Sequence, residues 1–263
     1  MRPSLGCLGA VAALACAAAA SGVAQPRPAN DVAAPAAASA AHASPATAQV
    51  TSEVDRTPPV ALRLAYDSRS IGTDGVTRDS RHADLMFRDK ATVWIERELP
   101  AALRDSEHDG HQASHGPHAG HAHDDAQGAP LLIQRDPDGK VRVTSILHKQ
   151  KRVIDVELAH QANVGYGGSW AAAYWLLDPV ALTRMEKLGA GAKGVERYRL
   201  VQGERTTLVD WDVAGKYARR IEQKDAHGLM RQVMTASVIP TPKVMPWQKL
   251  GEYSRGDYSD LLD

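Results

Sequence analysis

Cysteine is nearly absent from this sequence of 263 residues, because its two cysteines, Cys7 and Cys16, both lie close to the N-terminus. If an N-terminal signal segment is removed, no thiol remains, which excludes a disulfide, a thiolate metal ligand and a cysteine nucleophile. Excess charge is absent as well, since 31 Lys and Arg balance 31 Asp and Glu. A net charge of zero removes the main argument for nucleic-acid binding, so we expect no nucleic-acid partner.

Long apolar runs are also lacking, with one exception at the N-terminus. A positive residue followed by the small, apolar stretch Leu5 to Ala20 is typical of a secretory signal, with cleavage options after Ala20 or Ala24. We therefore predict a signal peptide over residues 1–24 and a periplasmic or secreted location. Residues 13–16 (Ala-Leu-Ala-Cys) resemble a lipoprotein cleavage box, although Ala13 replaces the preferred Leu, Val or Ile. Lipid anchoring through Cys16 is the alternative to a soluble exported chain.

Composition divides the rest of the chain. Residues 25–59 are rich in Ala, Pro, Ser and Thr and contain almost no large apolar side chain, which predicts a disordered linker. From residue 60 to residue 263, short alternating segments are separated by turn signals, and we predict a single β-rich domain there. A flexible His-rich insertion at about residues 104–129 interrupts this domain.

Alternating apolar and polar residues predict the strands, and their regular spacing favours an antiparallel meander. The expected strands cover residues 60–66, 83–87, 92–98, 131–134, 140–147, 152–158, 197–201, 206–212, 217–224 and 229–239. Residues 179–188 have helical spacing behind a potential N-cap, Asp178, whereas residues 170–177 fit either a strand or a helix. The predicted fold class is α+β, mostly antiparallel β: a single curved, half-barrel-like meander sheet with one or two helices and a disordered His-rich loop.

The insertion is chemically the most unusual segment. Six of the eleven histidines lie between residues 108 and 123, with carboxylates among and beside them. Neutral imidazole is the commonest protein ligand for Zn(II), Cu(II) and Ni(II), and carboxylates can complete the coordination. Glycine and proline argue against a helix, so we expect a mobile loop that binds a divalent transition metal loosely and with poor selectivity. The candidate ligands are His108, His111, His115, His118, His121, His123, Asp109 and Asp124.

No segment combines the residues of a catalytic site. Residues 189–194 match the dinucleotide fingerprint but follow a predicted helix and precede none, which favours a loop. Residues 165–170 lack the spacing of a nucleophile elbow and predict a turn that packs Tyr166 and Trp170. We therefore expect a non-enzyme without an organic cofactor. Four isolated histidines of the β-rich domain are expected at the surface or in turns: His82, His148, His160 and His227.

The hairpin of residues 217–233, Tyr-Ala-Arg-Arg-Ile-Glu-Gln-Lys-Asp-Ala-His-Gly-Leu-Met-Arg-Gln-Val, resembles periplasmic half-barrels of the LolA/LolB type. The preceding segment 206–212, with Trp211, fits the same pattern. Proteins of that family curl one antiparallel sheet around a few helices and carry lipoproteins or other apolar ligands. The resemblance covers about the last quarter of the chain and implies a concave apolar face for a lipid-like ligand, but no functional residue.

Two functions follow from these features. The first is an exported, non-catalytic protein that binds divalent transition metals through the His-rich loop, for capture, buffering or hand-over. The second is a periplasmic carrier or envelope-assembly protein that binds a lipid-like or lipoprotein ligand in a half-barrel groove, with another envelope protein as a possible partner and the His-rich loop incidental. A large dry concavity would favour the carrier, and a shallow, filled sheet would favour the metal-binding protein.

Overall fold

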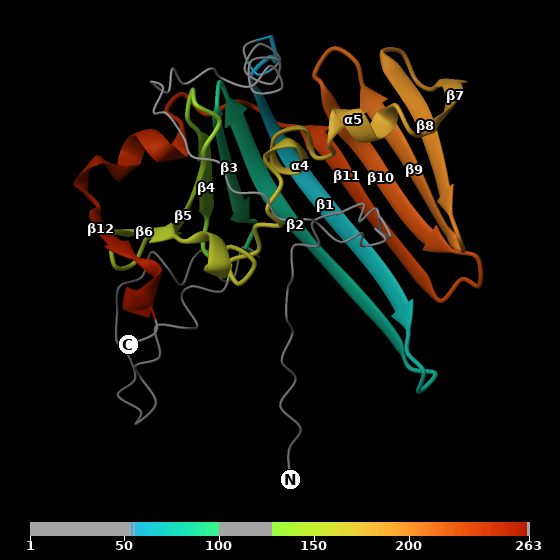
Figure 1. Cartoon of the computed structure of the whole chain (residues 1–263), viewed down its shortest axis with the longest axis horizontal. Helices are drawn as coiled ribbons and strands as arrows, with labels where there is room; N and C mark the ends of the chain where they lie inside the picture. Colours follow the sequence, from blue (N-terminus) through green and yellow to red (C-terminus); the bar gives the residue numbers. More distant parts are fainter. Residues whose placement is uncertain (1–53, 55, 100–127, 262–263) are drawn as a thin grey trace, which may run out of the picture.

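The computed structural model describes residues 54, 56–99 and 128–261. Its strands form one open, curved sheet in the order β12-β6-β5-β4-β3-β2-β1-β11-β10-β9-β8-β7 (Figure 1). Neighbouring strands are antiparallel throughout, except for the parallel pair β12 and β6. The predicted fold class, one curved antiparallel sheet with few helices, is therefore confirmed.

The strand bounds are β1 Val60–Ile71, β2 Thr77–Asp89, β3 Thr92–Arg97, β4 Leu131–Arg135, β5 Val141–Leu147, β6 Arg152–Val156, β7 Glu186–Ala190, β8 Val195–Gln202, β9 Arg205–Asp212, β10 Tyr217–Asp225, β11 Met230–Val238 and β12 Ser254–Asp257. The helices are η1 Leu158–His160, α4 Trp170–Trp175, α5 Pro179–Leu182, η2 Pro246–Glu252 and η3 Tyr258–Leu261. Within the described part of the chain, none of these helices has the length and apolarity needed to cross a bilayer.

Alternation along the strands gives the sheet two different faces. Leu62 and Met86 pair across β1 and β2 and are buried in a large core with α4, on what we call the inner face. Their neighbours Ala61 and Phe87 are buried on the opposite, outer face, under apolar residues of the C-terminal segment 239–253. In Figure 1, α4 and α5 lie in front of the sheet, over the inner face. These two cores show on which face of the sheet each strand side chain lies, and therefore which side chains can contact a ligand bound to that face.

One alternative is decided by the structure and one predicted element differs from it. Residues 170–177, which fit either a strand or a helix, contain the helix α4. The helix predicted over residues 179–188 is wrong beyond Leu182, because residues 186–190 form β7, which pairs with β8 at the edge of the sheet. The ladder with β8 therefore outweighs the helical spacing of a segment too short to stabilise a helix alone. Gly189, inside this strand at φ 110°, permits the accompanying bulge.

The predicted signal peptide, the His-rich segment and most of the predicted linker lie outside the described residues, and those predictions stay predictions. The described end of the linker is packed rather than extended. Val54 and Thr57 are buried, and Trp175 Nε1 donates to Thr57 Oγ1 at 3.3 Å. The folded body therefore begins several residues before the first strand.

Candidate functional site

An apolar cavity of about 100 Å³ lies on the inner face, between the sheet and the segment that contains α4. The sheet contributes Leu64, Tyr66, Ile95, Leu131, Ile133, Ile221 and Met234. The opposite wall is formed by Gly165, Tyr166, Gly167, Ser169, Ala172, Ala173 and Leu176. Because most of these side chains are aliphatic or aromatic, the cavity suits an apolar group.

Aromatic side chains of α4 pack into the core on the inner face. Trp170 stacks on Tyr174 with ring centroids 5.0 Å apart, and Tyr174 meets Trp175 edge-on at 5.0 Å. All three residues are buried. Pockets for whole small-molecule ligands usually measure about 300–1,000 Å³. A cavity of about 100 Å³ has room for no more than the end of an alkyl chain.

Local sequence explains why α4 is short and how its first turn is held. Ser169 caps the helix, since its Oγ accepts from the backbone N–H of Ala172 at 3.1 Å. The helix ends at Leu176, which has a left-handed conformation with φ 66°. Gly165 and Gly168 precede the helix with φ 86° and 77°, a region that glycine occupies without strain. A helix of this length is held in place by packing rather than by its own hydrogen bonds.

Arg88, on β2, anchors the C-terminal end of α4. Its guanidinium is fully buried and donates from Nη1 to the carbonyls of Tyr174 (2.8 Å) and Lys216 (3.1 Å). Nη2 donates to the carbonyls of Pro58 (3.0 Å) and Gly215 (2.7 Å). Burial lowers the pKa of Arg88 to about 10, so the side chain stays protonated at neutral pH. One side chain thus joins the residues before β1, the helix and the β9–β10 turn.

Four side chains, Tyr66, His82, Asp84 and Arg97, form a polar cluster beside the cavity. Strand register places them in two adjacent rows: Asp84 pairs with the cavity residue Leu64 on one side and with Arg97 on the other, and Tyr66 pairs with His82. The rings of Tyr66 and His82 stack with centroids 4.6 Å apart. Of these four residues, Tyr66 also lines the cavity, so the cluster adjoins the cavity at this residue.

The cluster is electrostatically unusual because it contains a buried ion pair. Arg97 Nε lies 2.7 Å from Asp84 Oδ1, and the exposed fractions of the two side chains are 27% and 3%. Burial raises the pKa of Asp84 against the opposing effect of Arg97. Burial raises the pKa of Tyr66, and the charge of Asp84 adds to this shift. Burial, followed by the charge of Arg97, lowers the pKa of His82, so this imidazole is neutral at neutral pH.

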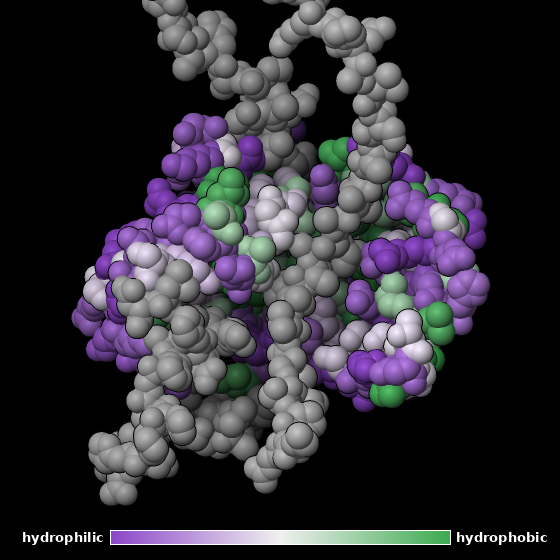
Figure 2. Space-filling view, turned by 60° about the horizontal axis from the view of Figure 1, so that its bottom comes forward, coloured by the Kyte–Doolittle hydropathy of each residue, from purple (hydrophilic) through white to green (hydrophobic). Residues whose placement is uncertain are grey.

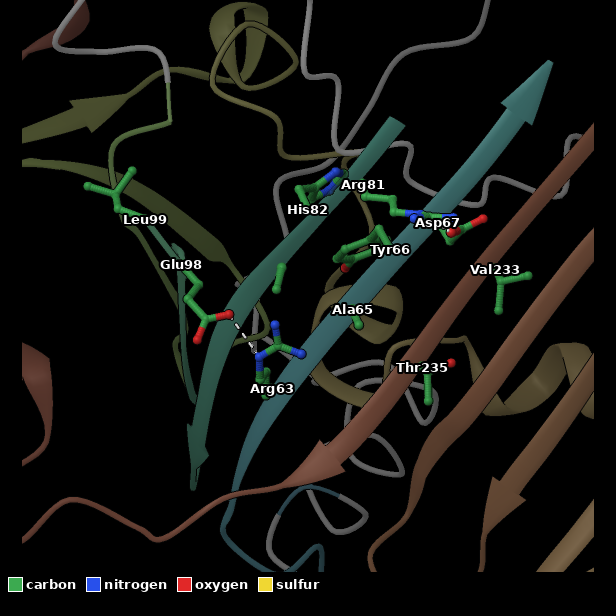
Figure 3. Close-up of a pocket in the computed structure, with 11 residues that line it drawn as sticks. Arg63, Ala65, Tyr66, Asp67, Arg81, His82, Glu98, Leu99, Val233 and Thr235 are labelled. Atoms are coloured by element: carbon green, nitrogen blue, oxygen red, sulfur yellow. Dashed lines mark hydrogen bonds and ion pairs between the residues drawn. The ribbon is translucent and has the colours of Figure 1, made fainter. Parts of the chain in front are cut away.

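A wider, shallow depression of about 580 Å³ lies on the outer face (Figure 3). Its floor consists of small or branched side chains: Ala65, Ala83, Val233 and Thr235. Arg63 pairs with Glu98 at 2.8 Å, and Arg81 pairs with Asp67 at 2.7 Å. Arg81 is exposed and Arg63 is partly exposed, and the depression is shallow and open. We therefore place the candidate site on the inner face.

The rest of the visible surface supports this choice. Figure 2 shows hydrophilic residues over both flanks of one end of the molecule, with hydrophobic residues only in small separate patches. The exposed large apolar side chains of the described residues are scattered over several strands and turns, among them Val76, Val180, Val201 and Leu229. Single exposed apolar residues are ordinary on soluble proteins and do not mark a binding surface.

All eight predicted metal ligands fall within residues 100–127, outside the described residues. Among the residues that the structure does describe, no three His, Cys, Asp or Glu side chains form a group that could hold a metal ion. Tyr166 and Trp170 are buried, as the turn prediction required, and His227 lies in the turn between β10 and β11. His82 differs from its predicted surface position, because it is half-buried against Tyr66.

Comparison with known proteins gives matches only at the level of structure. No protein-family model matches the chain, and no curated protein matches it in sequence. A conserved protein of unknown function from Thermus thermophilus is similar with a TM-score of 0.38 at 9% identity, over 80% of this chain and 99% of that chain. A LolA superfamily protein from Nitrosomonas europaea has a TM-score of 0.31 at 10% identity, over 74% of this chain and 94% of its own.

A DUF1329 family protein from Desulfovibrio piger is similar to the same degree, with a TM-score of 0.31 at 9% identity, over 76% of this chain and 94% of that chain. The suspected LolA-like resemblance thus recurs among solved structures. Identities and TM-scores this low carry no argument about function, which therefore rests on the site itself.

Proposed function

We propose that this chain is an exported, non-catalytic carrier that binds an apolar, lipid-like ligand between α4 and the inner face of its sheet. The observation that carries the proposal is the apolar cavity under α4, at the centre of the sheet. This cavity is smaller than the large dry concavity expected of a carrier, so the proposal depends on α4 moving away from the sheet. Its walls offer aliphatic and aromatic contacts and few polar groups, which suits an alkyl chain. The carrier function also agrees with what the resemblance of residues 217–233 implies.

Binding of a long chain requires the closed site to open. The start of α4 is the end that can swing, because it follows a loop with glycines at 165, 167 and 168. The other end is held by Arg88 through the carbonyl of Tyr174. Each methylene removed from water contributes about 0.8 kcal/mol. Affinity should therefore rise about fourfold per added methylene until the chain exceeds the length that the opened site encloses.

Displacement of an apolar fluorescent dye by alkyl ligands of increasing length tests this proposal on the purified chain. Ala173→Leu puts a larger side chain into the cavity and should weaken binding of every alkyl ligand at least tenfold. Ala171→Leu is the matched control, since Ala171 lies on the same helix and packs against the core without lining the cavity. Affinity that is independent of chain length, or equal loss in both variants, would contradict the proposal.

Export is the part of this proposal that rests on sequence alone. The apolar segment from Leu5 to Ala20 supports it. Mass spectrometry of the chain isolated from a cell-envelope fraction tests it, because the measured N-terminus reports cleavage and the mass of Cys16 reports acylation. An uncleaved chain found in the cytoplasm would contradict it.

A second function, metal binding by the His-rich segment, is favoured by one specific observation: six histidines within residues 108–123. The ligands proposed for Zn(II), Cu(II) or Ni(II) are the eight residues given above. Calorimetry with each ion on the full chain and on a 108–123 deletion tests this function. We expect heat from the full chain alone; equal heats from both chains, or none from either, would refute it.

A further inference from the structure

Asp84 is a buried carboxylate whose hydrogen bonds are incomplete. Among the described residues, Asp84 and Asp212 are the buried acidic side chains. Asp212 is satisfied by the fold, since it accepts from the backbone N–H of Gly215 at 2.7 Å and pairs with Arg219. Asp84 Oδ1 lies 2.7 Å from Arg97 Nε as an ion pair, but neither Oδ1 nor Oδ2 accepts a hydrogen bond within the described part of the chain. A buried acceptor without a donor costs free energy, and a ligand that supplies one recovers it.

The pairing of strands does not explain why this ion pair is buried. On the outer face of the same sheet, Arg63 with Glu98 and Arg81 with Asp67 keep their charges in contact with water. The pair of Asp84 and Arg97 instead lies on the inner face, where Asp84 is one strand and Arg97 two strands away from Leu64 in the cavity wall. A ligand tail in the cavity would therefore bring its head group next to these two charges.

The cluster selects a head group by its distribution of charge. His82 is neutral, so the negative charge of Asp84 and the positive charge of Arg97 sum to zero, with the acid deeper and the base nearer to solvent. A purely anionic head would meet Asp84, and a purely cationic head would meet Arg97. A head group with one charge of each sign matches both. An ammonium with N–H groups supplies donors for Asp84 Oδ2, and a guanidinium binds a phosphate in a planar, two-point geometry.

We propose that the polar cluster of Tyr66, His82, Asp84 and Arg97 binds the zwitterionic head group of an amphiphile whose alkyl tail occupies the cavity under α4. The ammonium group of this ligand carries N–H donors toward Asp84, and its phosphate faces Arg97. This inference rests on the proposed function, because the tail must bind on the inner face for the head to reach the cluster. It adds a ligand class: phosphoethanolamine-type amphiphiles rather than apolar molecules in general.

Three probes separate the head group from the tail. Hexadecylphosphoethanolamine and hexadecylphosphocholine have the same alkyl chain and phosphate, but only the first has N–H donors on its ammonium. Hexadecanol reports the contribution of the tail alone. With each probe below its micelle concentration, dye displacement should show the phosphoethanolamine probe binding about tenfold more tightly than the phosphocholine probe.

Variants assign this preference to named side chains. Asp84→Asn should abolish the preference, and Arg97→Gln should weaken both phosphate probes while leaving hexadecanol unchanged. Asp67→Asn is the matched control, because it makes the same chemical change on the outer face of the neighbouring strand β1. Circular dichroism confirms that each variant is folded. If Asp84→Asn does not fold, the comparison of the two probes on the native chain and on Arg97→Gln still decides the inference.

The outcomes distinguish the two proposals. Equal affinity of the native chain for both phosphate probes, together with tight binding of hexadecanol, would overturn the head-group inference and leave the carrier function standing. Absence of binding by all three probes would overturn the carrier function as well. A preference for phosphoethanolamine that persists in Asp84→Asn would show that a group other than Asp84 recognises the head group. That result would overturn the assignment to this cluster.

Discussion

Replacement of Arg88 by methionine should destabilise the folded chain strongly, because four carbonyl groups from three separate segments depend on this guanidinium. A hydrogen bond from a charged donor is worth about 1.5–3 kcal/mol. Removal of the guanidinium from water costs several kcal/mol in the native chain and offsets part of that sum. The carbonyl of Tyr174 is buried and loses its donor, whereas the hydrogen bonds to Pro58, Gly215 and Lys216 are only partly buried, so water can replace them.

The net loss expected for Arg88→Met is about 3–5 kcal/mol, the usual cost of removing one member of a buried charged network. For a folded body of about 200 residues, this lowers the melting temperature by roughly 6–20 °C. Urea unfolding and thermal melts of the native chain, Arg88→Met and Arg88→Lys measure this loss of stability. Arg88→Lys should lose less stability than Arg88→Met but more than none, because one ammonium group cannot reach all four carbonyls.

An arginine on the same strand provides the control for this experiment. Arg81 is exposed and paired with Asp67, and such surface pairs are worth about 0–1 kcal/mol. Arg81→Met should therefore unfold at nearly the same urea concentration and temperature as the native chain. Equal stability of Arg88→Met and Arg81→Met would refute the reasoning that Arg88 holds α4, the residues before β1 and the β9–β10 turn together.

Three other changes have defined outcomes. Burial raises the pKa of Asp84, so ionisation of this carboxyl destabilises the folded chain relative to the unfolded chain. Asp84→Asn should therefore gain stability relative to the native chain as pH rises from 3 to 7. A difference in the free energy of urea unfolding that stays constant over this pH range would contradict this. Gly215→Ala should lower stability by at least about 1 kcal/mol, since its Cβ would collide with the ring of Tyr217. An unchanged melting temperature would show that Gly215 and the ring of Tyr217 are not in this close contact. Trp247→Ala should cost about 2 kcal/mol and speed hydrogen exchange of residues 239–253, whereas unchanged exchange would show that this segment does not depend on its tryptophan.

Strands were predictable from the sequence where one face is apolar and the other polar. Residues 60–66 alternate clearly, and β1 begins at Val60 as predicted. The strand continues to Ile71 through residues that are polar on both faces, such as Ser68, whose partner is Ser80. This extension is held by backbone hydrogen bonds to a neighbouring strand, and a single sequence does not record them. For the same reason the sequence pattern of residues 186–190 predicts part of a helix, whereas the ladder with β8 makes them the strand β7.

The sequence of β2 contains a sign of the candidate site, but it can be interpreted only when it is known which faces of this strand are covered by other residues. Asp84, Met86 and Arg88 alternate with Ala83, Leu85 and Phe87, so the pattern places two charges and a methionine on one face. Both faces of β2 turn out to be buried at this point. Charged residues in a strand that is buried on both faces indicate either a side chain that holds separate segments together, as Arg88 does, or a binding site. The cavity itself was not predictable, because residues 165–176 reach the sheet only through tertiary packing.

Arginine has opposite effects on the two faces of this sheet. On the outer face the pairs lie in water, where each contributes little to stability and mainly keeps the surface hydrated. On the inner face, Arg88 donates from both terminal nitrogens to carbonyls of the fold and only its Nε has no partner among the described residues, whereas neither carboxylate oxygen of Asp84 accepts a hydrogen bond there. Apolar residues of similar volume would serve a purely structural core at these positions as well or better. The incomplete pair lies beside the cavity, where a bound head group can complete its hydrogen bonds, and this location favours a role in binding over a role in folding.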